Sequence, residues 1–71
     1  MSVIRVTEIL ATSPTSWEDA VDNGLERATK TIRNVKGIDV RGWKAEVQNA
    51  KIVEYRVVLK VAFEVEDVPG S

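Results

Sequence analysis

The last third of the chain alternates apolar and polar side chains, and this alternation limits the folds open to the sequence. Between residues 52 and 66 every second position is apolar: Val53, Tyr55, Val57, Leu59, Val61, Phe63 and Val65. This period of two is typical of a β-strand with one buried face. The strand would extend about 50 Å at about 3.4 Å per residue, whereas a domain of this length has a radius of gyration of about 11 Å. We therefore expect the strand to curl around a partner element and to pack on neighbouring subunits.

Residues 16–36 follow a different period and predict a single helix. Their apolar or small residues recur every three or four positions: Trp17, Ala20, Val21, Gly24, Leu25, Ala28, Ile32 and Val35. Such spacing places them on one stripe of a helix. Ser16 is placed to cap the N-terminus, with Asp19 reaching back as in a capping box. Gly37 is expected just past the C-terminal end, in the left-handed conformation that glycine favours.

Two further strands are expected on either side of the helix. Residues 3–11 are rich in β-branched side chains and roughly alternate. After the helix, the apolar positions change parity between Val40 and Trp43, which indicates a bulge near Gly42. Residues 48–51 fit a hairpin turn, with Asn49 at positive φ.

The expected order is β-α-β-β, an α+β fold in which a three-stranded antiparallel sheet wraps one helix. We expect residues 1–71 to form a single domain, with residues 67–71 as a frayed tail. The second face of the sheet carries Val58 and Ala62 beside charges, and it must meet solvent or another copy. One helix and one small sheet bury little apolar area, and the sequence contains no cysteine to cross-link them. We therefore expect a homo-oligomer.

The net charge and hydropathy of the sequence limit the classes of partner that the protein is expected to bind. The net charge is −1, with no basic stretch, so neither nucleic acid nor an anionic membrane is expected as a partner. No apolar run approaches the length of a membrane span, and the N-terminus lacks a signal-peptide pattern. A cytoplasmic protein is expected.

Few residues suit catalysis, and we expect no enzyme. The chain has no histidine and no cysteine, its glycines are scattered, and the hydroxyl groups of residues 12–16 have no base spaced to activate them. Its paired carboxylates could ligate a hard cation, but as helix-end and strand-edge charges they are more often solvated, so the metal ligands stay open. These pairs are Glu18/Asp19 and Glu64/Glu66/Asp67. Trp17 is expected as a core or interface anchor. Trp43 fits either packing at a subunit contact or stacking on a ligand.

Several stretches together resemble one protein family. Residues 6–18 (Val-Thr-Glu-Ile-Leu-Ala-Thr-Ser-Pro-Thr-Ser-Trp-Glu) are similar to the strand-to-helix opening of the dodecins. Residues 25–28 (Leu-Glu-Arg-Ala) and 31–34 (Thr-Ile-Arg-Asn) resemble the middle and end of their helix. Residues 54–63 (Glu-Tyr-Arg-Val-Val-Leu-Lys-Val-Ala-Phe) resemble their last strand. The likeness extends over nearly the whole chain in matching order and spacing.

The resemblance implies a hollow homododecamer of four trimers that stores or sequesters flavin without turnover. In flavin-binding members a tryptophan that opens the second strand covers the flavin, and a glutamine of the third strand hydrogen-bonds its polar edge. The matching positions here are Gly37 and Arg56. By analogy with base stacking, each missing ring removes about 1–3 kcal/mol. Arginine only donates hydrogen bonds, so Arg56 suits a carboxylate or phosphate instead.

The chain thus resembles the dodecin-like proteins that lack the aromatic residue and have been described as calcium-binding. Three hypotheses follow. The assembled shell binds, stores or sequesters a small ligand or ion, with calcium possible and flavin binding weakened or lost. Alternatively, it stores flavin (FMN or riboflavin) in a remodelled pocket, or it is a structural shell without a specific ligand.

Overall fold

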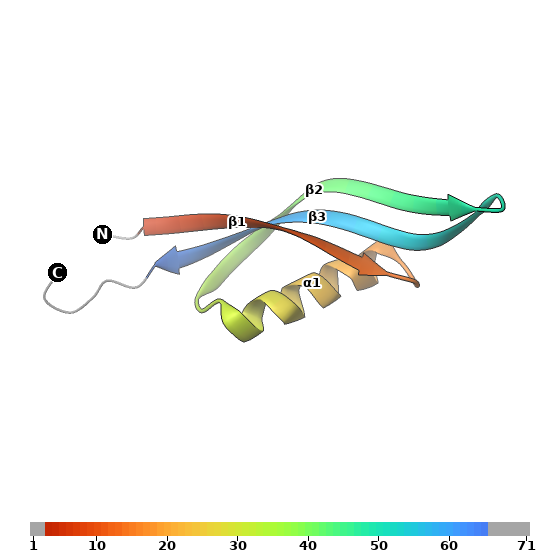
Figure 1. Cartoon of the computed structure of the whole chain (residues 1–71). Helices are drawn as coiled ribbons and strands as arrows, with labels where there is room; N and C mark the ends of the chain where they lie inside the picture. Colours follow the sequence, from red (N-terminus) through yellow and green to blue (C-terminus); the bar gives the residue numbers. More distant parts are fainter. Residues whose placement is uncertain (1–2, 66–71) are drawn as a thin grey trace, which may run out of the picture.

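The computed structural model describes residues 3–65, and over this range one helix lies on a three-stranded sheet (Figure 1). The elements follow as β1 (Val3–Ser13), α1 (Trp17–Thr31), β2 (Val35–Gln48) and β3 (Lys51–Val65). The sheet order is β1-β3-β2, and both pairings are antiparallel. The predicted β-α-β-β fold is therefore confirmed. The predicted frayed tail, residues 67–71, lies outside the described residues.

The core forms where the central strand β3 faces α1. Three alternating side chains of β3 are fully buried: Val57, Leu59 and Val61. The helix meets them with small residues four apart, Ala20, Gly24 and Ala28, all of which are buried. A Cβ atom added at Gly24 would lie 2.7 Å from Leu59 Cδ1 and 2.9 Å from Ala11 Cβ. Helix and sheet therefore approach so closely that only glycine fits this position without a shift of its neighbours.

The bulge and the hairpin turn are found where the sequence predicts them. The register of β2 against β3 shifts between Val40 and Gly42, so that the apolar residues on both sides of the bulge face α1. Asn49 and Ala50 have φ values of 52° and 61°. Two successive residues of positive φ are typical of the tight turn that suits the twist of a hairpin.

The helix is shorter than predicted, and its expected C-terminal end is wrong. It stops at Thr31, and Ile32 is extended while its N–H still donates to Ala28 O over 2.8 Å. Asn34, with a φ of 60°, makes the turn that glycine was expected to make. Val35 then pairs with Phe63 in the sheet, and Gly37 lies within β2 rather than at the helix end. Residues 32–36 therefore do not continue the helix, although their spacing fits one, because Val35 pairs with β3 instead.

The corner between β1 and α1 is closed by hydroxyl and carboxylate groups. Ser16 caps the helix as predicted, because its Oγ accepts a hydrogen bond from Asp19 N–H over 3.0 Å. The Asp19 carboxylate does not complete a capping box; it accepts a 2.6 Å hydrogen bond from Ser13 Oγ. Ser13 is buried and in turn accepts from Thr15 N–H. Strand β1 pairs with β3 as far as Ser13, two residues beyond the predicted end at Ala11.

The β2–β3 hairpin runs on past the N-terminal end of α1 (Figure 1). The pairing of β1 ends where Ser13 faces Tyr55, so residues 51–54 pair with β2 alone. The 15 residues of α1 span about 22 Å, less than half the length of β3. The Cα radius of gyration, 15.1 Å, reflects this extended shape. We call residues 46–54 the overhang.

Candidate functional site

Gly37, the first of the predicted site residues, lies in a shallow recess on the face of the sheet opposite α1. Gly37 stands opposite Ala62 of β3, and a Cβ atom added at Gly37 would meet no atom within 4 Å. The recess has a volume of about 350 Å³ and is lined by Val6, Gly37, Ile38, Asp39, Lys60 and Ala62. None of these lining residues is aromatic. The recess therefore has an apolar floor and room for a side chain or a ligand, but no ring to stack on.

Charges of both signs border this recess. The strand register places Lys60 of β3 between Glu8 of β1 and Asp39 of β2. Asp39 Oδ2 accepts a hydrogen bond from Arg41 Nη1 over 3.1 Å, and both side chains are more than half exposed. A row of carboxylate, ammonium and carboxylate groups therefore crosses the sheet beside Gly37. The sequence did not single out Lys60 or Asp39, because their meeting depends on the register of three strands.

Arg56 is engaged by two carboxylates of its own chain. Its Nε donates to Glu54 Oε1 over 2.6 Å, and its Nη2 donates to Glu46 Oε2 over 3.3 Å. The hydrogen bond to Glu54 and the negative charges of Glu54 and Glu46 raise the pKa of Arg56 above its usual value. Glu46 and Glu54 face each other across the two strands, and Arg56 offsets their repulsion. Part of the donor capacity expected to serve a ligand is thus already used within the chain.

Trp43 belongs to an aromatic cluster on the face of the sheet that carries α1. Its ring is T-shaped to that of Trp17, with centroids 6.3 Å apart, and Trp17 is T-shaped to Tyr55 at 4.8 Å. The indole N–H of Trp17 donates to the carbonyl oxygen of Lys44 over 2.9 Å. Trp17 therefore anchors the helix N-terminus to the hairpin. Trp43 remains 57% exposed, so its outer surface is open to a ligand or to another subunit.

One protomer does not bring the three predicted site residues together. Gly37 stands opposite Ala62, six residues along β3 from Arg56, which is about 20 Å in an extended strand. Trp43 stands opposite Val57, whose side chain is buried toward α1, so it lies on the other face of the sheet. Its ring therefore does not line the recess at Gly37. A small ligand in contact with both positions would need Gly37 from one copy of the chain and Arg56 from another.

The described residues hold no group of three or more acidic side chains, histidines or cysteines arranged for a metal ion. Calcium takes six to eight oxygen ligands, so two carboxylates such as Glu8 and Asp39 would not complete a site. Within residues 3–65, no helix has the length and hydrophobicity needed to cross a membrane.

Fold and site together define a small α+β protein in which one antiparallel sheet wraps one helix and leaves a shallow recess on its free face. Residues 3–66 match the family model named Dodecin. The chain belongs to the dodecin family.

Two relatives show how the chain stands within the family. It is 36% identical over 63 residues to the calcium dodecin of Mycobacterium tuberculosis, with 89% of each chain covered. It is 34% identical over 65 residues to a dodecin of Thermus thermophilus, with 92% of this chain and 94% of the other covered.

Solved structures of the same two proteins are similar to this one. A Thermus thermophilus dodecin variant superposes with a TM-score of 0.91 at 32% identity, covering 96% of this chain and 100% of the other. The calcium dodecin of Mycobacterium tuberculosis, described as having a novel calcium-binding site, superposes with a TM-score of 0.79 at 33% identity, covering 99% and 97%. The sequence is thus slightly closer to the calcium dodecin, whereas the backbone is closer to the Thermus protein.

Proposed function

We propose that this protein assembles into a hollow dodecamer of trimers that binds, stores or sequesters a small ligand or ion without catalysing a reaction. We further propose that it belongs to the members without a flavin-stacking tryptophan, so that its affinity for flavin is weakened or lost. Membership of the dodecin family supports the binding role. The observation that carries the proposal is the recess around Gly37, whose lining contains no aromatic side chain.

The position of Arg56 supports the same conclusion. Its guanidinium group already donates to Glu54 and Glu46, so a polar ligand edge would compete with two carboxylates for these donors. Three of the four aromatic residues of the chain gather on the opposite face of the sheet: Trp17, Trp43 and Tyr55. The recess thus offers room and apolar contact, but neither of the two contacts expected in a flavin-binding member.

A titration that follows flavin fluorescence tests this proposal. We expect weak quenching by the natural chain and tighter binding by Gly37→Trp, because nothing obstructs a side chain at that position. A stacking gain of about 1–3 kcal/mol per ring corresponds to an affinity about 5- to 150-fold higher. Gly37→Ala is the matched control, because it adds a Cβ atom without a ring and should leave the affinity unchanged. Tight, stoichiometric quenching by the natural chain would contradict the proposal.

Calcium is the second candidate ligand, favoured by the similarity to the calcium dodecin and by the carboxylates of Glu8 and Asp39 beside the recess. Any such site would need oxygen ligands from more than one copy. Calorimetric titration of chelator-treated protein should show calcium binding that Asp39→Asn weakens, whereas Asp22→Asn on the exposed face of α1 should not. If neither calcium nor flavin binds, the remaining hypothesis is a structural shell without a specific ligand.

Assembly is tested separately by light scattering. One chain has a mass of 7.9 kDa, so twelve copies would give about 95 kDa (12 × 7.9). The uncovered overhang and the marginal size of one core support this expectation. A mass equal to that of one chain at micromolar concentration would contradict the dodecamer.

A further inference from the structure

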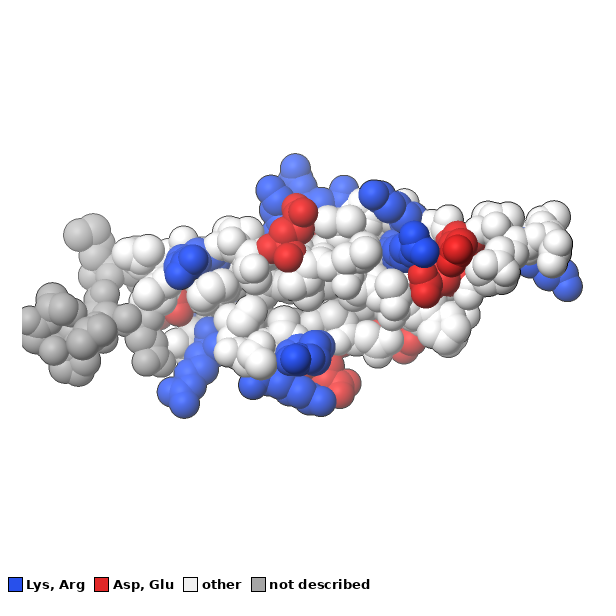
Figure 2. Space-filling model, in the orientation of Figure 1, with Lys and Arg blue, Asp and Glu red and all other residues white. Residues whose placement is uncertain are grey.

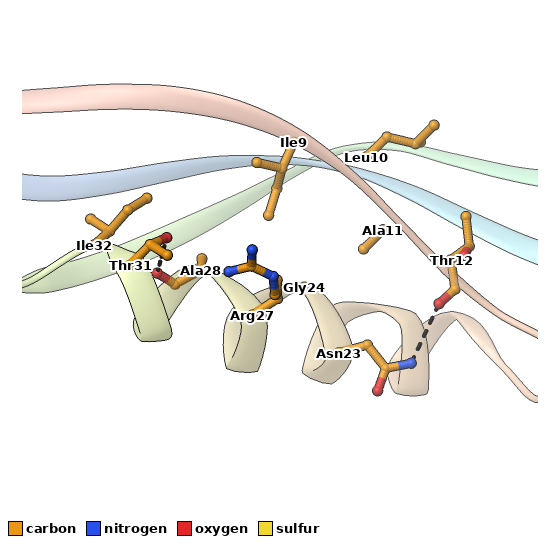
Figure 3. Close-up of a pocket in the computed structure, with 10 residues that line it drawn as sticks. All are labelled: Ile9, Leu10, Ala11, Thr12, Asn23, Gly24, Arg27, Ala28, Thr31 and Ile32. Atoms are coloured by element: carbon orange, nitrogen blue, oxygen red, sulfur yellow. Dashed lines mark hydrogen bonds between the residues drawn. The ribbon is translucent and has the colours of Figure 1, made fainter.

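The face of the sheet that points away from α1 carries large aliphatic side chains. Figure 3 shows how β1 alternates: Ile9 and Ala11 point toward α1, whereas Leu10 points away from it. Because the side chains of a strand alternate, Val6 shares the outer face with Leu10. Both residues are 59% exposed. In the space-filling view, uncharged areas separate the charged side chains (Figure 2). The outer face therefore offers apolar contact in addition to charge.

The recess at Gly37 combines two kinds of surface, which lie in two neighbouring rows across the three strands. The apolar row consists of Val6, Ala62 and Gly37, and the charged row consists of Glu8, Lys60 and Asp39. The two rows are two residues apart along β3, which is about 7 Å in an extended strand. All of these residues except Glu8 line the recess. The recess therefore presents an apolar floor beside an ammonium group.

The ammonium group of Lys60 is available to a ligand. Lys60 lines the recess and is half-buried. Of its two neighbours in the charged row, Asp39 already accepts a hydrogen bond from Arg41 over 3.1 Å, and Glu8 is exposed. Within residues 3–65, no carboxylate oxygen lies within 4 Å of the Lys60 ammonium group. Its charge is therefore not neutralised by a direct ion pair inside this part of the chain.

We propose that the recess binds a small organic carboxylate, whose charged group pairs with Lys60 and whose apolar body lies on Val6, Ala62 and Gly37. This inference rests on the ligand-binding part of the proposed function and names the class of ligand. An ammonium group and a carboxylate attract each other more strongly where apolar surface excludes water. The lining contains no ring, so the body of the ligand can be aliphatic.

The neighbouring carboxylates limit the charge of the ligand. A calcium ion between Glu8 and Asp39 would meet the ammonium group of Lys60, which repels it. A phosphate ester carries a charge of about −1.5 to −2 and would meet two carboxylates in the same row. A carboxylate carries the single negative charge that matches Lys60. Lys60 therefore selects a singly charged anion.

Octanoate and octan-1-ol are the probes, because they share an apolar chain and differ in charge. Saturation-transfer difference NMR measures the affinity of the natural chain for each, and we expect octanoate to bind more tightly. Lys60→Met should weaken octanoate binding by about 5- to 10-fold, between the values for an exposed ion pair and a buried charge-assisted hydrogen bond. It should leave octan-1-ol binding unchanged. Lys60→Arg keeps the charge and should retain octanoate binding.

Three further variants separate charge from apolar contact. Lys30→Met removes the same charge from the exposed surface of α1, on the other side of the sheet, and should leave both affinities unchanged. Glu8→Gln should tighten octanoate binding, because it removes a carboxylate that competes for Lys60. Val6→Thr should weaken the binding of both probes, whereas Val3→Thr, 55% exposed on the opposite face of β1, should not.

Equal affinity for the two probes would overturn the proposal, as would an octanoate affinity that Lys60→Met leaves unchanged. If octanoate does not bind while flavin or calcium does, this class of ligand fails and the binding function stands. If none of the three binds, both fail. Circular dichroism shows whether each variant folds, and Lys60→Gln replaces Lys60→Met if that variant does not.

Discussion

Gly24→Ala should destabilise this protein, although alanine is normally the better helix residue. In an exposed helix this change would stabilise by about 1 kcal/mol. Here the new Cβ atom would lie 2.7 Å from Leu59 Cδ1 and 2.9 Å from Ala11 Cβ. Leu59 is fully buried and Ala11 is fixed to the β1 backbone, so neither can move away freely. Overpacking of a core costs about 1–3 kcal/mol, which leaves a net loss of about 0–2 kcal/mol.

Urea unfolding followed by circular dichroism measures this loss, and it must be done at one protomer concentration because assembly couples to stability. For a domain of this size, each 1 kcal/mol lost should also lower the melting temperature by about 4–8 °C. Gly37→Ala is the matched control. Its Cβ atom meets nothing within 4 Å, so stability should stay unchanged or rise by up to about 1 kcal/mol. A stabilising Gly24→Ala would refute the close approach of α1 to the sheet.

Two further changes test the polar contacts. Ser13→Ala should lower the free energy of unfolding in urea by about 1–3 kcal/mol, because it removes the buried donor to Asp19 and the acceptor for Thr15 N–H. An unchanged midpoint would show that the corner between β1 and α1 does not hold the helix in place. Arg56→Gln should lower the midpoint of urea unfolding at neutral pH, because Glu46 and Glu54 then face each other without a cation. That difference from the natural chain should shrink at high salt, which screens the repulsion between these carboxylates, and a difference that persists there would point to lost packing instead.

Much of the fold could be predicted because it depends on local chemistry. The alternation of β3 predicted its buried face, and Val57, Leu59 and Val61 are indeed fully buried. The parity change before Trp43 predicted the bulge, since a strand can present both apolar sets to one helix only if a residue is added between them. Ser16 was recognised as the cap because a hydroxyl before a helix satisfies a free N–H group.

The C-terminal end of the helix could not be predicted in the same way. Ile32 and Val35 fit the helical spacing, but they are also β-branched residues that suit a strand. The choice between the two is made by Phe63, which pairs with Val35 from the far end of the chain. Long-range pairing of this kind leaves no mark in the local sequence.

The candidate site also depends partly on the local sequence and partly on long-range pairing. The sequence by itself determined that glycine stands at position 37 and arginine at position 56, because these are identities of single residues. Only the tertiary structure decided their surroundings: the register brings Lys60 and Asp39 beside Gly37, and it sets Glu46 against Arg56. Side chains on neighbouring strands meet only through that register, and a shift of one residue would turn each of them to the opposite face of the sheet.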